Sequence, residues 1–404
     1  MQGQLPARGA CDFVVRRGVS SRRLHIPCVS RIDRMGSALL ERRTDFRGTS
    51  LALFTRSRSI VALDIGSSHV KLLELEVDRG GRRRLKHFGI APVPPEAIVD
   101  GAFMNTGAVV ATIRELIARH KVKTREAAVA ISGNSVIIKR ISLPVMTQQE
   151  LEESITWEAE QYIPFDVNDV NIDAHILKGG GDGSGQMDVL LVAARKEIVN
   201  EYQGLLIEAG LKPAVVDVAA FALENCYELN YDRPRTPVAL VNVGASTVNI
   251  NVLRDGASAF TRDLATGARN YTEEIQRIMG VSFEEAEALK IGGSEADRGG
   301  VVPEDVERVL STVSENIASE VGRTLDFFSG GSGNVSLVYL SGGGATTPGL
   351  RAALHQQTGA DVQIMDPFRN IQVDERAFQP KYLKDVAAQA AIAVGLGLRR
   401  ADDK

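Results

Sequence analysis

A strand, a tight turn and a second strand are predicted by the stretch Val61-Ala62-Leu63-Asp64-Ile65-Gly66-Ser67-Ser68-His69-Val70-Lys71-Leu72. Gly66 lets the backbone approach a ligand closely, because glycine has no side chain. Ser67, Ser68 and the neighbouring N–H groups can donate hydrogen bonds to phosphate oxygens. Asp64 is placed to hold a metal ion through water, and Lys71 can reach a phosphate as a point charge. The stretch is therefore a candidate phosphate site, although ordinary hairpin turns share its pattern.

A second copy of this pattern occurs in the other half of the chain, over residues 238–250. Asn242 corresponds to Asp64, Gly244 to Gly66 and Ser246 to Ser68. Two such units in one chain indicate a duplicated fold. Two hairpins that face each other across a cleft would hold a polyphosphate from both sides.

A third glycine-rich turn, Ser341-Gly342-Gly343-Gly344, follows an apolar strand and precedes a predicted helix. That order suits a backbone that passes close to a flat ligand at a helix N-terminus. The three turns together predict a nucleotide site.

Charge is distributed unevenly along the 404 residues, which carry a formal net charge of −4. Residues 1–60 hold twelve Arg, no Lys and four acids, so the remainder of the chain is near −12. An acidic main body excludes general electrostatic binding of nucleic acid. Of the three cysteines, which lack metal-ligand spacing, only Cys226 lies in the main body, and this favours a reducing compartment. No apolar run approaches the length of a membrane span.

The order of predicted elements divides the chain into an α/β protein with two lobes. Residues 1–58 are predicted to be a basic, disordered leader, or to result from a start codon chosen too far upstream, with Met35 as the true start. A targeting presequence would look similar, and a basic tail that touches anionic lipid is the functional alternative. The first lobe is predicted over 59–236, with an inserted module at about 132–191. The second lobe covers 237–400, and its last helix returns toward the first lobe.

Local signals place several elements inside these lobes. Thr147 and Glu150 form a predicted capping box at the start of a helix in the inserted module. Trp157 on that helix is expected to pack into the core. Gly210 is predicted as the C′ residue of the helix before it. The last helix, 384–398, is rich in small residues that allow close approach to another helix or sheet.

These motifs resemble the actin-like ATPase superfamily, whose members bind ATP between two lobes. The resemblance covers about residues 59–400. It implies a duplicated α/β fold, Mg²⁺ held through water by Asp64 and Asn242, and an ATP site that combines two phosphate loops, an A-E-x-x-K segment and an adenosine loop. The corresponding residues are Gly66, Ser67, Ser68, Lys71, Gly244, Ala245, Ser246, Thr247, Glu287, Lys290, Gly342, Gly343 and Gly344.

A narrower resemblance is to the PilM family of type IV pilus assembly, carried by residues 71–75, 157–165, 208–213 and 272–277. It implies a cytoplasmic ATP-binding platform with an inserted subdomain of the FtsA and PilM type. A groove in the first lobe, beside the inserted module, would receive the N-terminal cytoplasmic segment of the inner-membrane protein PilN. Other inner-membrane and motor components of the pilus machine are implied as partners, so membrane association is indirect.

Two departures from the superfamily pattern bear on catalysis. Asn242 stands where the superfamily usually has Asp, and a neutral amide adds no negative charge to a metal site. No signature marks the residue that positions the attacking water; Asp217 and Glu224 are candidates besides Asp64. His69 is interpreted as a solvated turn residue. ATP binding with slow hydrolysis is therefore expected.

Two other functions of the same fold stay open. A small-molecule kinase would need a general-base Asp aimed at a substrate hydroxyl, which the sequence does not mark. A polymerising, membrane-tethered scaffold of the FtsA kind would need an amphipathic C-terminal anchor, whereas residues 398–404 are short and polar.

Overall fold

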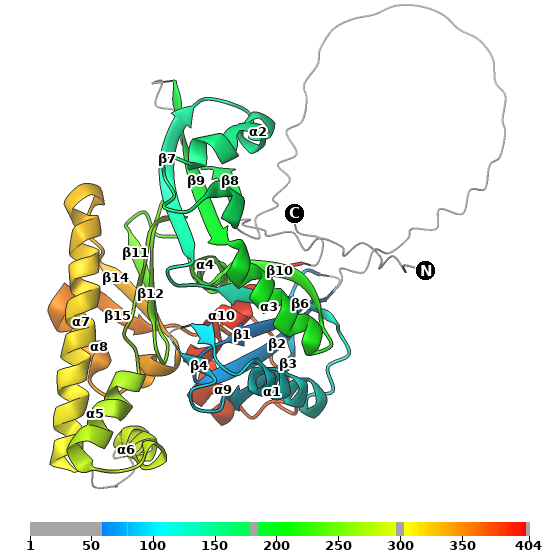
Figure 1. Ribbon diagram of the computed structural model, residues 1–404. Coiled ribbons are helices and arrows are strands. Elements are labelled where there is room, and N and C mark those ends of the chain that lie inside the picture. Colours follow the sequence, from blue (N-terminus) through cyan, green and yellow to red (C-terminus); the bar gives the residue numbers. More distant parts are fainter. Residues whose placement is uncertain (1–58, 79, 100, 178–184, 296–302, 401–404) are drawn as a thin grey trace, which may run out of the picture.

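The computed structural model describes residues 59–400, except for 79, 100, 178–184 and 296–302. The predicted leader at 1–58, with its alternatives, lies outside the described residues, as do residues 401–404. Two lobes built on five-stranded sheets lie side by side, and a smaller sheet with one helix projects from the first lobe (Figure 1).

The first sheet contains the opening stretch as its central hairpin. Its order is β10-β6-β1-β2-β3, with β1, β2 and β3 antiparallel and β6 and β10 parallel to β1. Near-continuous apolar sequence in β1 and β6 fits their burial on both faces. The strands are β1 (Val61–Ile65), β2 (His69–Val77), β3 (Arg83–Pro92), β6 (Glu126–Ile131) and β10 (Lys212–Val218).

The second sheet repeats the first, strand for strand. Its order is β13-β12-β11-β14-β15, again with three antiparallel strands followed by two parallel ones. The duplication predicted from the two hairpins is therefore confirmed. The strands are β11 (Val238–Val243), β12 (Val248–Arg254), β13 (Ala257–Leu264), β14 (Leu337–Ser341) and β15 (Asp361–Ile364).

Helices cover both faces of the first sheet. One face packs on α1 (Thr106–Arg119) and α3 (Lys196–Glu208), whose apolar stripes complete one core. The predicted C′ glycine of α3, Gly210, has a φ of +84°, in the left-handed region that favours glycine. The other face packs on α4 (Ala219–Asn230), within a core that also takes in Leu240 and Tyr339 of the second sheet. A short hairpin joins β4 (Ile98–Val99) and β5 (Ala102–Phe103).

The helices of the second lobe form a layer on its sheet (Figure 1). Tyr271 from this layer is fully buried, and its hydroxyl group shares a hydrogen bond of 2.9 Å with Ser314 Oγ. The helices are α5 (Arg269–Met279), α6 (Phe283–Glu295), α7 (Glu304–Ser332) and α8 (Leu350–Thr358), with a 3₁₀ turn η3 (Gly343–Thr346) after β14.

The predicted last helix is broken into three pieces, α9 (Pro380–Val386), η4 (Ala387–Ala390) and α10 (Ala391–Gly397). At the break, Gly342 N–H donates to the carbonyl oxygen of Ala388 at 2.7 Å, a contact between residues far apart in sequence. The small residues bring α10 against α4 and the first sheet. A Cβ on Gly395 would lie 1.7 Å from Ala222 O, and one on Gly397 would lie 2.7 Å from Leu73 Cδ2.

The inserted module has its own sheet, ordered β7-β9-β8, and its own core. Its capping box is confirmed, since Thr147 Oγ1 accepts from Glu150 N and Glu150 Oε2 accepts from Thr147 N. The prediction for Trp157 is wrong, because this side chain is 72% exposed. Leu151, Ile155 and Ala159 form the buried stripe of the helix, and Trp157 faces away from it. The elements are β7 (Val136–Pro144), α2 (Gln148–Ala159), η1 (Val167–Asp169), β8 (Val170–Ile176) and β9 (Gln186–Arg195).

Candidate functional site

The first phosphate loop joins β1 to β2 and is closed by a hydrogen bond from Gly66 N–H to His69 O at 3.1 Å. Asp64 and Lys71 lie opposite each other in the strand register. Their side chains form an ion pair, with Lys71 Nζ 3.1 Å from Asp64 Oδ2, and both are largely buried. The two charges proposed for metal and phosphate therefore neutralise each other, and a bound phosphate would share Lys71 with this carboxylate.

The second phosphate loop has the same backbone form. Gly244 N–H donates to Thr247 O at 2.8 Å, and a Cβ on Gly244 would lie 2.9 Å from that oxygen. Asn242 and Asn249 occupy the register positions of Asp64 and Lys71. Their amides are joined by a hydrogen bond of 3.1 Å from Asn242 Nδ2 to Asn249 Oδ1. The second lobe thus has a neutral amide pair where the first has an ion pair.

The two phosphate loops touch each other across the lobes. Ser67 Oγ lies 2.8 Å from Ser246 Oγ, and Arg269 at the start of α5 donates to Ser67 O at 3.4 Å. A further hydrogen bond between the lobes runs from Gly133 N–H to Asp263 Oδ2 at 2.5 Å. Arg269, Gly133 and Asp263 could not be predicted as contact residues, because no local sequence pattern marks a contact between segments so far apart.

The adenosine loop packs directly on the second phosphate loop. Gly342 has a φ of +89°, and its Cβ would lie 2.3 Å from Val243 O. A Cβ on Gly344 would lie 2.5 Å from Val243 Cγ1, whereas one on Gly343 would meet only Gln389, at 3.9 Å. Gly342 and Gly344 therefore allow close packing of the protein on itself, and Gly343 is the glycine with room beside it.

The predicted ribose and adenine residues form a compact group on α6 and α5. Lys290 Nζ donates to Glu287 Oε1 at 2.6 Å and to Thr272 Oγ1 at 2.9 Å. Thr272 Oγ1 also donates to Glu287 Oε1, at 2.5 Å. This hydrogen-bonded triad holds the acid and the lysine together beside the start of α5, where Lys290 also reaches Ala268 O at 3.4 Å.

His69 is not the solvated turn residue that the sequence suggested. Its ring is partly buried, and its Nδ1 lies 2.9 Å from Ser68 Oγ. Burial lowers the pKa of His69 from 6.5, and the positive charges of Lys71 and Lys290 lower it further, against an opposing effect of Glu287.

Asp217 and Glu224, the other catalytic candidates, are both buried. Asp217 Oδ2 lies 3.5 Å from Nε of Arg399, which follows α10, and Asp217 Oδ1 accepts from Val218 N at 2.8 Å. Glu224 lies within α4 and is 2% exposed. These contacts tie Asp217 to the packing of the last helix, so neither carboxylate is presented to solvent.

The side chains near the loops can be tested against the metal that the resemblance implies. Within the described residues, no three His, Cys, Asp or Glu side chains cluster as a metal cage. Mg²⁺ in phosphate sites commonly uses one or two carboxylates, with water and phosphate oxygens as the other ligands. Asp64 fits that pattern as a single carboxylate, while Asn242 already uses its amide in bonds to Asn249 and Ser341.

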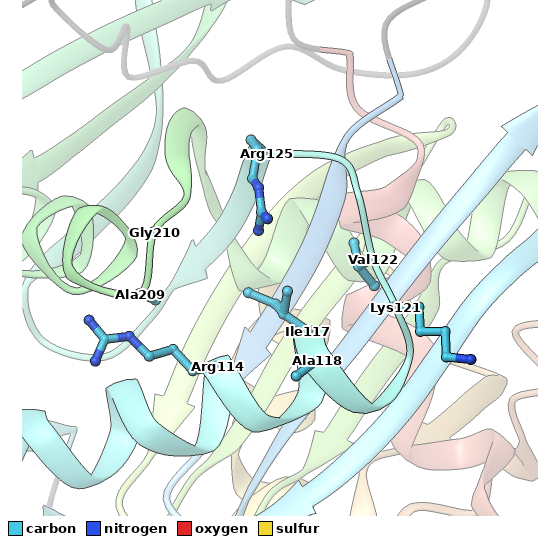
Figure 2. Close-up of a pocket in the computed structure, with 8 residues that line it drawn as sticks. All are labelled: Arg114, Ile117, Ala118, Lys121, Val122, Arg125, Ala209 and Gly210. Carbon is cyan, nitrogen blue, oxygen red and sulfur yellow. The ribbon is translucent and has the colours of Figure 1, made fainter.

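A cavity of about 610 Å³ lies elsewhere on the first lobe (Figure 2). It is located where α1 and α3 end, whereas the inserted module joins the other end of α3. It is therefore distinct from the groove expected beside that module. Its lining residues are Arg114, Ile117, Ala118, Lys121, Val122, Arg125, Ala209 and Gly210.

The repeated sheets, the paired hairpin loops and the inserted module define a protein of the actin-like ATPase fold, as predicted. The ethanolamine utilization protein EutJ from Carboxydothermus hydrogenoformans has this fold in common with the chain. Its structure aligns with a TM-score of 0.51 and 16% identity, covering 84% of this chain and 89% of that one.

The chain belongs to the family of the type IV pilus assembly protein PilM, whose family model matches residues 62–401. A solved PilM-PilN type IV pilus biogenesis complex aligns with a TM-score of 0.74 and 28% identity, covering 85% of this chain and 98% of that chain. The cell division protein FtsA of Bacillus subtilis is 23% identical over an alignment of 357 positions, which covers 76% of this chain and 78% of FtsA. Among the described residues, no helix is both long enough and apolar enough to span a membrane.

Proposed function

We propose that this protein is an ATP-binding assembly platform of the type IV pilus machine, at the cytoplasmic face of the inner membrane. ATP would bind between the lobes, and the first lobe would bind the N-terminal cytoplasmic segment of a PilN-like protein. Membership of the PilM family and the likeness to a PilM-PilN complex support the partner. Nucleotide state would then influence assembly with the inner-membrane and motor components.

The observation that carries the nucleotide site is the contact between Ser67 Oγ and Ser246 Oγ, 2.8 Å apart. It places two glycine turns of the same form face to face, although 179 positions separate them in sequence. The Ser67 and Ser246 hydroxyl groups, one from each lobe, therefore lie together, and hydroxyl groups can donate hydrogen bonds to phosphate oxygens. ATP bound there would contact both lobes and favour one of their relative positions.

Binding is expected to be better developed than hydrolysis. Bound Mg²⁺ would neutralise phosphate charge, and Asp64 is the carboxylate that these loops offer it. Asn242 contributes no charge, and both Asp217 and Glu224 are buried. A residue that activates the attacking water needs access to that water, so these two carboxylates support at most slow turnover.

Calorimetric titration with ATP and Mg²⁺ tests the nucleotide site. Lys71→Ala should weaken ATP binding at least tenfold, because it removes the cation of the first loop. Lys212→Ala is the matched control: it removes an exposed lysine of the same lobe, whose Nζ is 3.8 Å from Glu126, and should leave affinity unchanged. Equal affinities for the two variants would refute the assigned site.

The partner is tested by titrating a synthetic PilN N-terminal peptide with and without a non-hydrolysable ATP analogue. The proposal predicts binding of the peptide and a change in its affinity when the analogue is present. If the peptide binds with the same affinity with and without the analogue, the proposed effect of nucleotide on partner binding is refuted. Absence of peptide binding in both conditions would refute the proposed partner.

A further inference from the structure

A row of hydrogen-bonded polar side chains crosses the second sheet from the adenosine loop to the first lobe. Ser341 pairs with Asn242 in the strand register, Asn242 with Asn249, and Asn249 with Asp263. Residues paired in register on neighbouring strands point to the same face of the sheet. The four side chains therefore form one line across β14, β11, β12 and β13.

Each bond in this row has a fixed direction. Gly133 N–H donates to Asp263 Oδ2 at 2.5 Å, and Asn249 Nδ2 donates to Asp263 Oδ1 at 2.8 Å. A carboxylate only accepts, so Asn249 must turn its oxygen toward Asn242, which donates to it at 3.1 Å. Asn242 in turn presents its oxygen to Ser341 Oγ, which donates at 3.2 Å.

The near end of the row is built into the adenosine loop. Ser341 is fully buried immediately before Gly342, and a Cβ on Gly342 would lie 2.9 Å from Asn242 Oδ1. A nucleotide held by the loop would restrict this backbone and with it the position of the Asn242 amide. The far end is the N–H of Gly133, in the loop between β6 and β7 of the first lobe.

We propose that this row is a positioning device that couples occupation of the adenosine loop to the contact between Asp263 and Gly133. The inference rests on the proposed ATP site and deepens it. It also gives Asn242 a role that an aspartate cannot fill, since the amide must accept from Ser341 and donate to Asn249 at once. In the first lobe, the equivalent pair is the ion pair of Asp64 and Lys71, and Lys71 lies opposite Ile90 on the next strand, so the polar row does not continue there.

Asn242→Asp breaks the row without a change in size, because it sets a carboxylate oxygen against Asn249 Oδ1. The double change Asn242→Asp with Asn249→Lys restores a donor, since an ammonium group at position 249 can donate both to the new carboxylate at position 242 and to Asp263. Lys71 shows that a lysine fits the equivalent position opposite a carboxylate. Ser314→Ala is the control, because it removes a buried hydroxyl of the same lobe outside the row.

Hydrogen exchange of the segment containing Gly133 measures the coupling, with and without saturating ATP and Mg²⁺. In the unchanged protein and in Ser314→Ala, ATP should slow exchange about fivefold or more, as couplings between sites commonly do. In Asn242→Asp the effect of ATP should fall below about twofold, and the double variant should recover it. Because coupling between two sites is reciprocal, Asp263→Asn should weaken ATP binding about fivefold.

Two failures can be separated in this experiment. An unchanged protein that binds no ATP in calorimetry would refute the proposed function. ATP binding with equal protection of Gly133 in the unchanged protein, Asn242→Asp and the double variant would refute the row alone. Loss of ATP-dependent protection in Asn242→Asp without recovery in the double variant would also overturn it, because a merely damaged fold would behave in that way.

Discussion

Replacing Gly395 with alanine tests how closely the last helix is packed. A Cβ at this position would lie 1.7 Å from the carbonyl oxygen of Ala222 in α4, whereas an ordinary contact needs about 3.4 Å. The two helices would therefore have to separate by roughly 1.7 Å. A gap of about 0.5–1 Å already forfeits a quarter to a half of the dispersion attraction between facing atoms.

The expected cost is at the upper end of overpacking, about 3 kcal/mol. Since a large chain loses about 2 °C of Tm per kcal/mol, the Tm should fall by about 6 °C. Calorimetry and urea denaturation of the purified variant measure both quantities. Gly204→Ala is the matched control, because a Cβ on this helical glycine of α3 meets nothing within 4 Å.

The control should be as stable as the unchanged protein or more stable by up to about 1 kcal/mol, since alanine favours helix over glycine. The predicted overpacking would be refuted if the Tm values of Gly395→Ala and Gly204→Ala differed by less than about 1 °C. At about 2 °C per kcal/mol, that difference corresponds to only about 0.5 kcal/mol of stability. Such a result would mean that α10 can move away from α4 without losing its packing.

Three further predictions concern separate parts of the molecule. A double-mutant cycle of Ser67→Ala and Ser246→Ala, followed by denaturation, should give a coupling of about 1 kcal/mol; additive effects would mean that the interlobe bond contributes nothing. Burial lowers the pKa of His69 and of His87 below 6.5, so the unfolded chain binds more protons than the folded one. The contribution of the two histidines to stability is complete above pH 6.5 and declines as the pH falls below it. The urea midpoint should therefore fall less between about pH 7.5 and 5.5 in a variant with both histidines changed to Gln than in the unchanged protein. Trp157→Ala should change the free energy of unfolding by less than about 0.5 kcal/mol, because the ring is 72% exposed, and a larger loss in denaturation would show that it packs on the protein.

The duplicated fold was predictable because its signals are local. Each hairpin loop is marked by apolar strands on both sides of a glycine and hydroxyl turn, so the correspondence of Gly66 with Gly244 reveals the repeat. The capping box at Thr147 likewise depends on residues three positions apart. The structure confirms both elements. Each could be predicted because its signal does not depend on distant segments.

The long-range features could not be predicted in the same way. The break at η4 coincides with a hydrogen bond from Gly342 N–H, 46 positions earlier, to the carbonyl oxygen of Ala388. Trp157 was assigned to the core by residue type, although its helical position opposite the Leu151 stripe indicated exposure. Asn249 could have been noticed, because it stands where the repeat places Lys71, but its bond to Asp263 required the sheet order.

The position of α10 in the first lobe has a consequence for synthesis on the ribosome. The core that contains Ala62 and Leu73 also contains residues 390–396, which are translated about 330 residues after β1. At roughly 5–20 residues per second, the emerging first lobe would wait about 15–65 s for the helix that completes it. During that interval its apolar face would be open to chaperones, so nascent chains should depend on chaperones more than the finished protein does.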